Sequence, residues 1–127
     1  MLSQSTPMAT LPTTDMSTAR RFYEGTLGLT PDSEVPDGVI YHCGAGSLFV
    51  YKSAYAGTNK ATAVTFGLPV DDFDDEVERL RDEGIELMTF DLEGVDWKDG
   101  VASIGEGMRA AWFTDPAGNI INVSTGM

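Results

Sequence analysis

The residues of this sequence that could take part in acid–base, nucleophilic or metal chemistry form no recognisable catalytic pattern. His42 is the only histidine and Cys43 the only cysteine. Consecutive strand residues point to opposite faces, so these two are not expected to form a catalytic dyad. Asp91, Glu93 and Glu106 could add carboxylates to a metal site built on His42. Their positions along the chain, however, match no spacing that is typical of metal ligands. A single strand histidine that is hydrogen-bonded or partly exposed is the simpler interpretation of His42.

Two tryptophans are further candidates for binding a ligand. The sequence contains neither a G-x-S-x-G nucleophile turn nor a G-x-x-x-x-G-K-[ST] phosphate loop. Trp97 lies within Glu93–Gly107, which we predict to be the longest irregular stretch, and Trp112 lies three residues before Asp115. Indole rings offer large flat surfaces for stacking, so both are candidates for lining a pocket; the alternative is that they fill a core.

The charge of the chain is strongly acidic and unevenly distributed. The formal net charge is −12, from 20 acidic and 8 basic residues. Thirteen of the acidic but only three of the basic side chains lie between Asp71 and Asp99. Such a field repels phosphate backbones and anionic lipid surfaces, so neither nucleic acid nor membrane is an expected partner. Two interpretations of this acidic segment are open: it attracts a cationic ligand, or it is simply a solvated face of the protein.

The length of 127 residues predicts one domain, spanning residues 8–127, with residues 1–7 as a short flexible tail. No apolar stretch reaches the length of a membrane helix, and the first eight residues lack the pattern of a secretory signal. A single cysteine excludes an internal disulfide framework, which fits a reducing compartment. We therefore expect a cytoplasmic protein.

An internal repeat predicts the architecture. Leu11–Met16 and Leu68–Phe73 share Leu, Pro and Asp in register, 57 residues apart, and each copy follows a strand-like run and precedes a helix-like run. The repeat divides the domain into two modules, residues 8–57 and 58–127.

Turn and capping signals place the elements of both modules. Asp15 is a good N-cap for a helix over Met16–Leu27, and Asp71 or Asp72 for a helix over Phe73–Glu83. Asp115–Gly118 has the composition of a tight turn. The strands expected in the first module are Met8–Thr14, Thr30–Val35, Val39–Cys43 and Ser47–Ser53; those in the second are Ala63–Leu68, Ile85–Leu92, Met108–Thr114 and Asn119–Thr125.

Each module therefore has the order strand–helix–strand–strand–strand. Neither module can bury both faces of its own sheet, so we expect the two sheets to pair and curl around a shared interior. The predicted class is α+β, with two βαβββ modules forming a curved mixed sheet around a cavity.

The two ends of the repeat resemble the vicinal oxygen chelate superfamily, also called the glyoxalase/bleomycin resistance protein/dioxygenase family. Asp15, Ala19, Phe22, Tyr23 and Leu27–Leu29 are similar to its D…A..FY…LGL opening. Its closing F.DP.GN.I pattern is similar to Phe113, Asp115, Pro116, Gly118, Asn119 and Ile121. The resemblance covers Met8 to Ser124 and implies the fold described above and a homodimer.

Enzymes of this family generally hold a divalent metal through His, Gln or Glu side chains on the first and last strand of each module. Carried over by the family's spacing, these four positions are Met8, Phe49, Thr65 and Asn122. None offers an imidazole or a carboxylate, and a slip of one position in either direction brings in no better ligand. We therefore expect no metal, no other cofactor and no catalytic residue.

The resemblance then implies a cavity lined by apolar, aromatic and hydroxyl groups. The leading hypothesis is a metal-independent small-molecule-binding protein, similar to the drug-sequestering branch of the family, that holds an apolar, aromatic or cationic compound. The alternative is a metal-dependent lyase, isomerase or dioxygenase with unrecognised ligands, and a third possibility is a domain that only binds a protein partner. The expected cavity residues are Met8, Thr10, Phe49, Tyr51, Thr65, Trp97, Trp112, Asn122 and Ser124.

Overall fold

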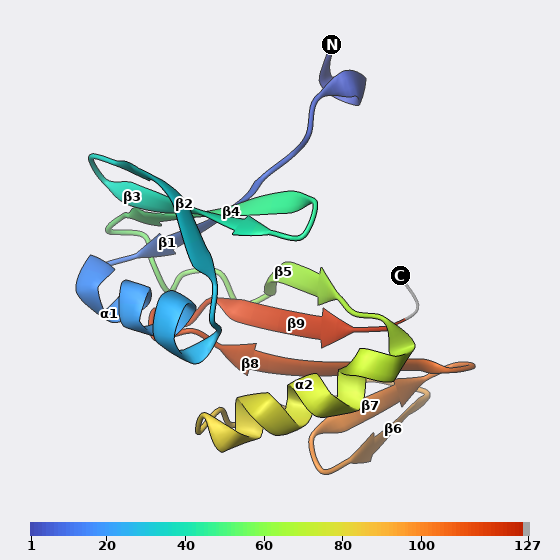
Figure 1. Cartoon of the computed structure of the whole chain (residues 1–127). Coiled ribbons are helices and arrows are strands. Elements are labelled where there is room, and N and C mark those ends of the chain that lie inside the picture. Colours follow the sequence, from blue (N-terminus) through green and yellow to red (C-terminus); the bar gives the residue numbers. More distant parts are fainter. Residues whose placement is uncertain (126–127) are drawn as a thin grey trace. The chain divides into compact units, whose positions relative to one another are not determined.

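The computed structural model describes residues 1–125 and divides the chain into two compact units, one comprising residues 1–60 and 115–119 and the other the remainder (Figure 1). The second sequence module was predicted to span 58–127, and its last two residues lie outside the described part. Each unit contains one sheet and its own helical segment, so the expected α+β class is confirmed. In residues 1–125 no helix is long and apolar enough to cross a membrane.

The first unit is built on a four-stranded sheet of order β1-β4-β3-β2. The first strand is parallel to β4, and the other pairs are antiparallel. Residues 2–4, in the expected tail, form a short exposed 3-10 turn, η1. The elements are η1 (Leu2–Gln4), β1 (Ala9–Thr13), α1 (Met16–Arg20), the π-helix η2 (Arg21–Thr26), β2 (Thr30–Val35), β3 (Gly38–Cys43) and β4 (Gly46–Lys52).

The helix of the first unit begins where the sequence predicts it. Asp15 is the N-cap: its Oδ1 accepts from the Thr18 backbone N–H at 3.2 Å and its Oδ2 from the Thr18 hydroxyl at 3.0 Å. These bonds hold the pKa of the Asp15 carboxyl below its usual value. After Arg20 the helix continues as η2 to Thr26, with Leu27 as the C-cap, so the segment predicted as Met16–Leu27 is one continuous helical segment in two forms that ends one residue earlier.

The second unit is built on a five-stranded sheet of order β5-β9-β8-β7-β6. Its first strand is again parallel to its last, so Leu11–Met16 and Leu68–Phe73 both join such a strand to a helix. The elements are β5 (Thr62–Gly67), α2 (Val70–Asp82), β6 (Val95–Lys98), β7 (Val101–Ile104), β8 (Met108–Thr114) and β9 (Ile120–Ser124).

Two details of the second unit differ from the sequence prediction. Ile85–Leu92 is not a strand: Met88 alone bridges to Trp112, because β7 already pairs with β8 from Met108 to Ala110. The stretch Glu93–Gly107, predicted to be irregular, instead contains the β6–β7 hairpin. Its two-residue turn is Asp99-Gly100, both with positive φ (51° and 81°), the conformation that tight hairpins prefer.

The start of α2 also differs. The helix begins at Val70, and Pro69, rather than Asp71 or Asp72, occupies the N-cap position. Proline restrains the chain at this entry, and the Asp72 N–H bonds to the Pro69 carbonyl. The two carboxylates instead lie in the first turn, where the helix dipole favours them.

Each helical segment covers one face of the sheet in its own unit. In the first unit the buried side chains of Leu11, Tyr41 and Val50 lie on the face that meets Tyr23 of η2. In the second unit α2 buries Phe73, Val77 and Leu80 towards the face that carries Arg109, whose guanidinium lies 4.8 Å from the Phe73 ring centre. The opposite side of each sheet is called here its helix-free face.

Candidate functional site: the helix-free faces

In the first unit, three of the expected cavity residues lie on the helix-free face. Thr10 pairs with Phe49 across β1 and β4, and Tyr51 lies two residues further along β4, on the same side as Phe49. Leu11 and Val50, which alternate with them, are buried on the other side. Met8 precedes β1 and is 38% exposed.

Phe49 and Tyr51 form a flat aromatic surface on this face. Their ring centres are 5.4 Å apart and the rings are inclined by only 21°. Gly38, opposite Tyr51 on β3, makes this arrangement possible. A Cβ atom there would lie 2.5 Å from Cε1 of Phe49 and 2.5 Å from the Val50 carbonyl oxygen. The missing side chain leaves the room that the Phe49 ring takes up.

In the second unit, all five expected residues share the helix-free face of the sheet. Thr65 pairs with Asn122, which pairs with Trp112, so the three lie in one row across β5, β9 and β8. A second row leads from Ser124 through Ala110 and Ala102 to Trp97. Because side chains alternate along a strand, both rows face away from α2 and Arg109.

The two tryptophans belong to an aromatic cluster, defined here as Phe90, Trp97 and Trp112. The indole rings of Trp97 and Trp112 have centres 5.9 Å apart and are tilted by 54°, and Phe90 meets Trp112 edge-on at 5.5 Å. The Trp112 indole N–H donates to the Thr62 hydroxyl at 3.2 Å. All three rings are only half-buried, so they keep surface for a ligand.

Two members of this arrangement were not singled out from the sequence. Phe90 lies in Ile85–Leu92, predicted to be a strand, and its approach to Trp112 depends on the irregular path of that segment. Thr62 begins β5, and its contact with Trp112 spans 50 residues. No local pattern indicates either contact.

The helix-free face of the second unit contains little acid–base chemistry. Among its paired strand residues in the described chain there is no carboxylate, amine, imidazole or thiol. Asn122 is 5% exposed, and its amide group donates to the carbonyls of Ala111 and Val123. The face therefore offers ring surfaces, hydroxyl groups and an amide that is already hydrogen-bonded.

The four positions carried over from the family's metal site fall into both units. Thr65 and Asn122 are direct cross-strand partners. Phe49 pairs with Thr10, whereas continuing the β1–β4 register places Met8 opposite Ser47. Serine, like the residues at the other positions, offers neither an imidazole nor a carboxylate. Within residues 1–125, no group of three or more His, Cys, Asp and Glu side chains could hold a metal ion together.

His42 and Cys43 lie on opposite sides of β3, as expected of strand neighbours. His42 is exposed and pairs with Thr30 and Ser47, on the helix-free face. Cys43 is half-buried, and burial raises the pKa of its thiol, which disfavours the reactive thiolate.

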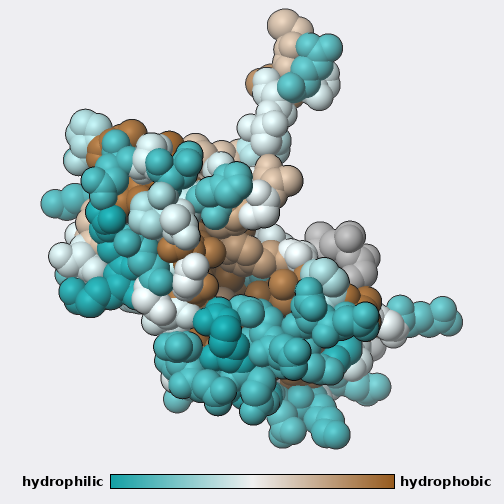
Figure 2. Space-filling view, viewed as in Figure 1, coloured by the Kyte–Doolittle hydropathy of each residue, from teal (hydrophilic) through white to brown (hydrophobic). Residues whose placement is uncertain are grey.

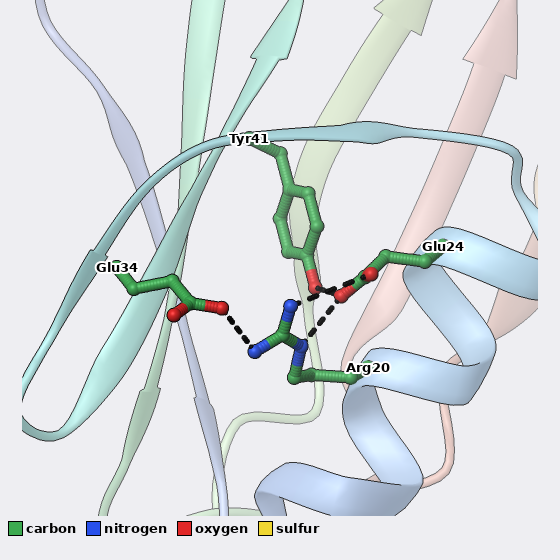
Figure 3. A network of polar contacts seen from close by, with 4 residues as sticks. All are labelled: Arg20, Glu24, Glu34 and Tyr41. Carbon is green, nitrogen blue, oxygen red and sulfur yellow. Dashed lines mark hydrogen bonds and ion pairs between the residues drawn. The ribbon is translucent and has the colours of Figure 1, made fainter.

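Polar residues on the helix side of the first unit link its helical segment to its sheet. The Arg20 guanidinium lies between Glu24 and Glu34, at 2.7 Å and 2.5 Å, and the Tyr41 hydroxyl donates to Glu24 at 2.9 Å (Figure 3). The Arg20 bond, with the Tyr41 bond in support, holds the pKa of Glu24 below its usual range. These contacts join α1 to β2 and η2 to β3.

The motif residues near the chain end are also structural. The Asp115 carboxylate accepts from the backbone N–H groups of Ala117 and Asn119 at 3.0 and 2.8 Å, and the Asn119 amide donates to it at 2.7 Å. The predicted turn is present, with the Gly118 N–H bonded to the Asp115 carbonyl. The same Asn119 amide donates to the Pro12 carbonyl, which ties the turn to β1.

Comparison with known proteins agrees with this architecture. The family model of the glyoxalase/bleomycin resistance protein/dioxygenase superfamily matches residues 6–123. Curated protein sequences give no match. Among solved structures, a glyoxalase/bleomycin resistance protein/dioxygenase from Alicyclobacillus acidocaldarius is similar at 16% identity, with a TM-score of 0.73 over 96% of this chain and 91% of the other.

Two further structures carry more specific names. The fosfomycin resistance protein FosX from Mesorhizobium loti is 16% identical, with a TM-score of 0.69 over 100% of this chain and 95% of the other. Lactoylglutathione lyase from Agrobacterium tumefaciens is 20% identical, with a TM-score of 0.67 over 97% and 94%. At these identities the structural likeness shows the fold alone. Because the family model covers nearly the whole sequence, the chain belongs to the glyoxalase/bleomycin resistance protein/dioxygenase superfamily.

Proposed function

We propose that this chain is a metal-independent small-molecule-binding protein whose aromatic cluster takes up a flat apolar or aromatic compound. The observation that carries the proposal is the pair of half-buried indoles of Trp97 and Trp112 on a sheet face whose paired strand residues are not ionisable. An unpaired charge on a ligand would find no counter-charge on that face, whereas a ring would gain stacking contacts of roughly 0.5–1.5 kcal/mol beyond its area burial.

The position of the acidic residues bears on a cationic ligand. The surface around α2 is hydrophilic (Figure 2), with exposed carboxylates of Asp71, Asp72, Asp74 and Asp75, and α2 covers the face opposite the aromatic cluster. These carboxylates are a solvated helix surface rather than part of the proposed site. A cation would therefore bind through the faces of the indoles, by cation–π attraction.

The proposed site in the first unit is the Phe49–Tyr51 surface, together with Met8 and Thr10. Its stacked rings suit the same kind of ligand, and the hydroxyl of Tyr51 adds one polar group.

A homodimer is part of the proposal. β1 and β2 are the edge strands of the four-stranded sheet, and β5 and β6 those of the other. Pairing with a second copy would cover such an edge, and symmetric dimers are the commonest oligomers. Sedimentation equilibrium at high micromolar concentration tests this: a dimer supports the proposal, and a monomer refutes it.

The proposed binding is tested by screening neutral and cationic aromatic compounds for changes in tryptophan fluorescence and melting temperature. We expect planar apolar compounds to quench or shift the emission and to raise the melting temperature, because a ligand that binds only the folded state stabilises it. The screen is run before and after treatment with a chelator, and no loss of binding is expected. A library that changes neither signal contradicts the proposal.

The second candidate is a metal-dependent enzyme, since similar structures include a lactoylglutathione lyase. Elemental analysis of purified protein separates the two. Stoichiometric zinc, nickel, manganese or iron, together with turnover lost on chelation, would favour the enzyme and overturn metal independence.

A further inference from the structure

The hydrogen bond between Trp112 and Thr62 connects strands that are not neighbours. Trp112 is on β8 and Thr62 on β5, and β9 lies between them in the sheet. Adjacent strands are about 4.8 Å apart, so the indole must extend along the sheet surface over β9 to bring its Nε1 within 3.2 Å of the Thr62 Oγ1. A ring standing upright on β8 could not reach that hydroxyl.

This bond also determines what the Trp112 ring offers to a ligand. The indole N–H is the only hydrogen-bond donor of a tryptophan side chain, and the side chain contains no acceptor group. With the N–H directed at Thr62, the ring retains its π surface and its apolar edge. Trp97 and Phe90 contact the same ring, so one end is held by a hydrogen bond and the body by two aromatic neighbours.

We infer that Thr62 is a positioning residue for the aromatic cluster: its hydroxyl sets the orientation of Trp112 and takes up its donor, so that the cluster selects planar rings by stacking. The inference rests on the proposed function for the identity of the ligand. The orientation of Trp112 in the free protein does not depend on the ligand's identity and is measured without any ligand.

The test is the isosteric substitution Thr62→Val, which removes the hydroxyl and keeps the β-branched shape suited to a strand. The matched control is Thr114→Val. Thr114 and Thr62 are both exposed and lie in the same cross-strand row, each paired with Ile120. No side-chain hydrogen bond is found for Thr114 within residues 1–125.

Two measurements on the free protein report the position of Trp112. The exciton coupling of the two indoles in circular dichroism depends on their distance and tilt, and the solvent exchange of the Trp112 indole N–H in NMR depends on its hydrogen bond. Thr62→Val should reduce the coupling and accelerate the exchange, while Thr114→Val should leave both as in the original chain. Unchanged coupling and exchange in Thr62→Val would overturn the positioning role.

A third measurement joins the inference to the site. The neutral fluorescent probe phenylnaphthylamine should bind the original chain and bind Thr62→Val about fivefold more weakly, the equivalent of one ordinary hydrogen bond. Equal affinity in both, with altered dichroism, would overturn the link to ligand selection. If the original chain does not bind the probe while Thr62→Val alters the dichroism, the proposed function fails and the positioning role stands.

Discussion

The Tyr23 hydroxyl donates a hydrogen bond of 2.6 Å to the Asp115 carboxylate, and both residues are buried. Tyr23 comes from the opening family motif and Asp115 from the closing one, 92 residues later. The hydrogen bond joins η2 to the turn that precedes β9. Neither of these two motif residues lies on a helix-free face. Their hydrogen bond gives both of them a structural role within the first unit.

Tyr23→Phe should destabilise the protein by about 1–3 kcal/mol, because a buried carboxylate loses a donor that water cannot easily replace. Urea denaturation at neutral pH measures the loss. Tyr55→Phe is the control, since that side chain is 78% exposed and should change little. A Tyr23→Phe protein as stable as the original would show that the bond contributes nothing.

Stability should fall at alkaline pH. Burial, and then the neighbouring Asp115, raise the pKa of Tyr23 above the ordinary value of 10.0, and burial and Glu24 raise that of Tyr41. A group whose pKa is higher in the folded state contributes its full stability below its unfolded pKa, and loses it as the pH rises through and beyond that value. The urea denaturation midpoint should fall as the pH rises above the ordinary pKa of tyrosine, and it should fall less steeply in Tyr23→Phe than in the original chain. An equally steep fall in both proteins would contradict the contribution of Tyr23.

At acid pH both Asp15 and Glu24, whose pKa values are lowered, contribute, and the prediction concerns Glu24. Its pKa is lowered, first by the Arg20 hydrogen bond, so its stabilising contribution is present above the ordinary value of 4.5 and is lost as the pH falls below it. Glu24→Gln should flatten this part of the pH–stability curve. Glu106→Gln, at an exposed turn residue, serves as the control for the substitution itself. Identical curves for Glu24→Gln and the original chain would exclude the role of the Arg20–Glu24 pair.

Gly38→Ala should cost about 1–3 kcal/mol, because the new methyl group would overlap the Phe49 ring and the Val50 carbonyl oxygen. Gly67→Ala is the matched control: it also lies in a strand, and nothing stands within 4 Å of its added Cβ. The difference in free energy of unfolding between the two variants measures the overlap. Equal stabilities would mean that the Phe49 ring moves aside without cost.

Trp97→Ala should weaken binding of a planar aromatic compound about tenfold, because it removes one of the two indoles at the proposed site. Fluorescence titration gives the dissociation constant, and Tyr55→Ala, in the exposed segment after β4, serves as a control for aromatic content. Binding that is unaffected by Trp97→Ala would place the ligand elsewhere.

Much of the fold could be predicted from local sequence signals. The α1 cap at Asp15, the Asp115–Gly118 turn and seven of the eight expected strands depend on neighbouring residues and on the period-two alternation, both of which can be read along the chain. The Asp99-Gly100 hairpin also has a local signal, because an Asp-Gly pair is typical of tight hairpin turns. The prediction of an irregular segment there was therefore wrong.

The aromatic cluster depended on contacts between distant parts of the chain. Alternation could assign Trp112 to one side of its strand, but not show that Phe90 and Thr62 meet its ring, because one depends on an irregular segment and the other on a strand two places away in the sheet. Likewise the sequence showed an acidic segment, and only the packing of α2 placed the carboxylates of that helix opposite the indoles. The residue types determine what chemistry this chain can offer. Strand order and side-chain packing decide which of those groups face one another. Only the tertiary structure shows these contacts, because they join residues that no short-range sequence pattern connects.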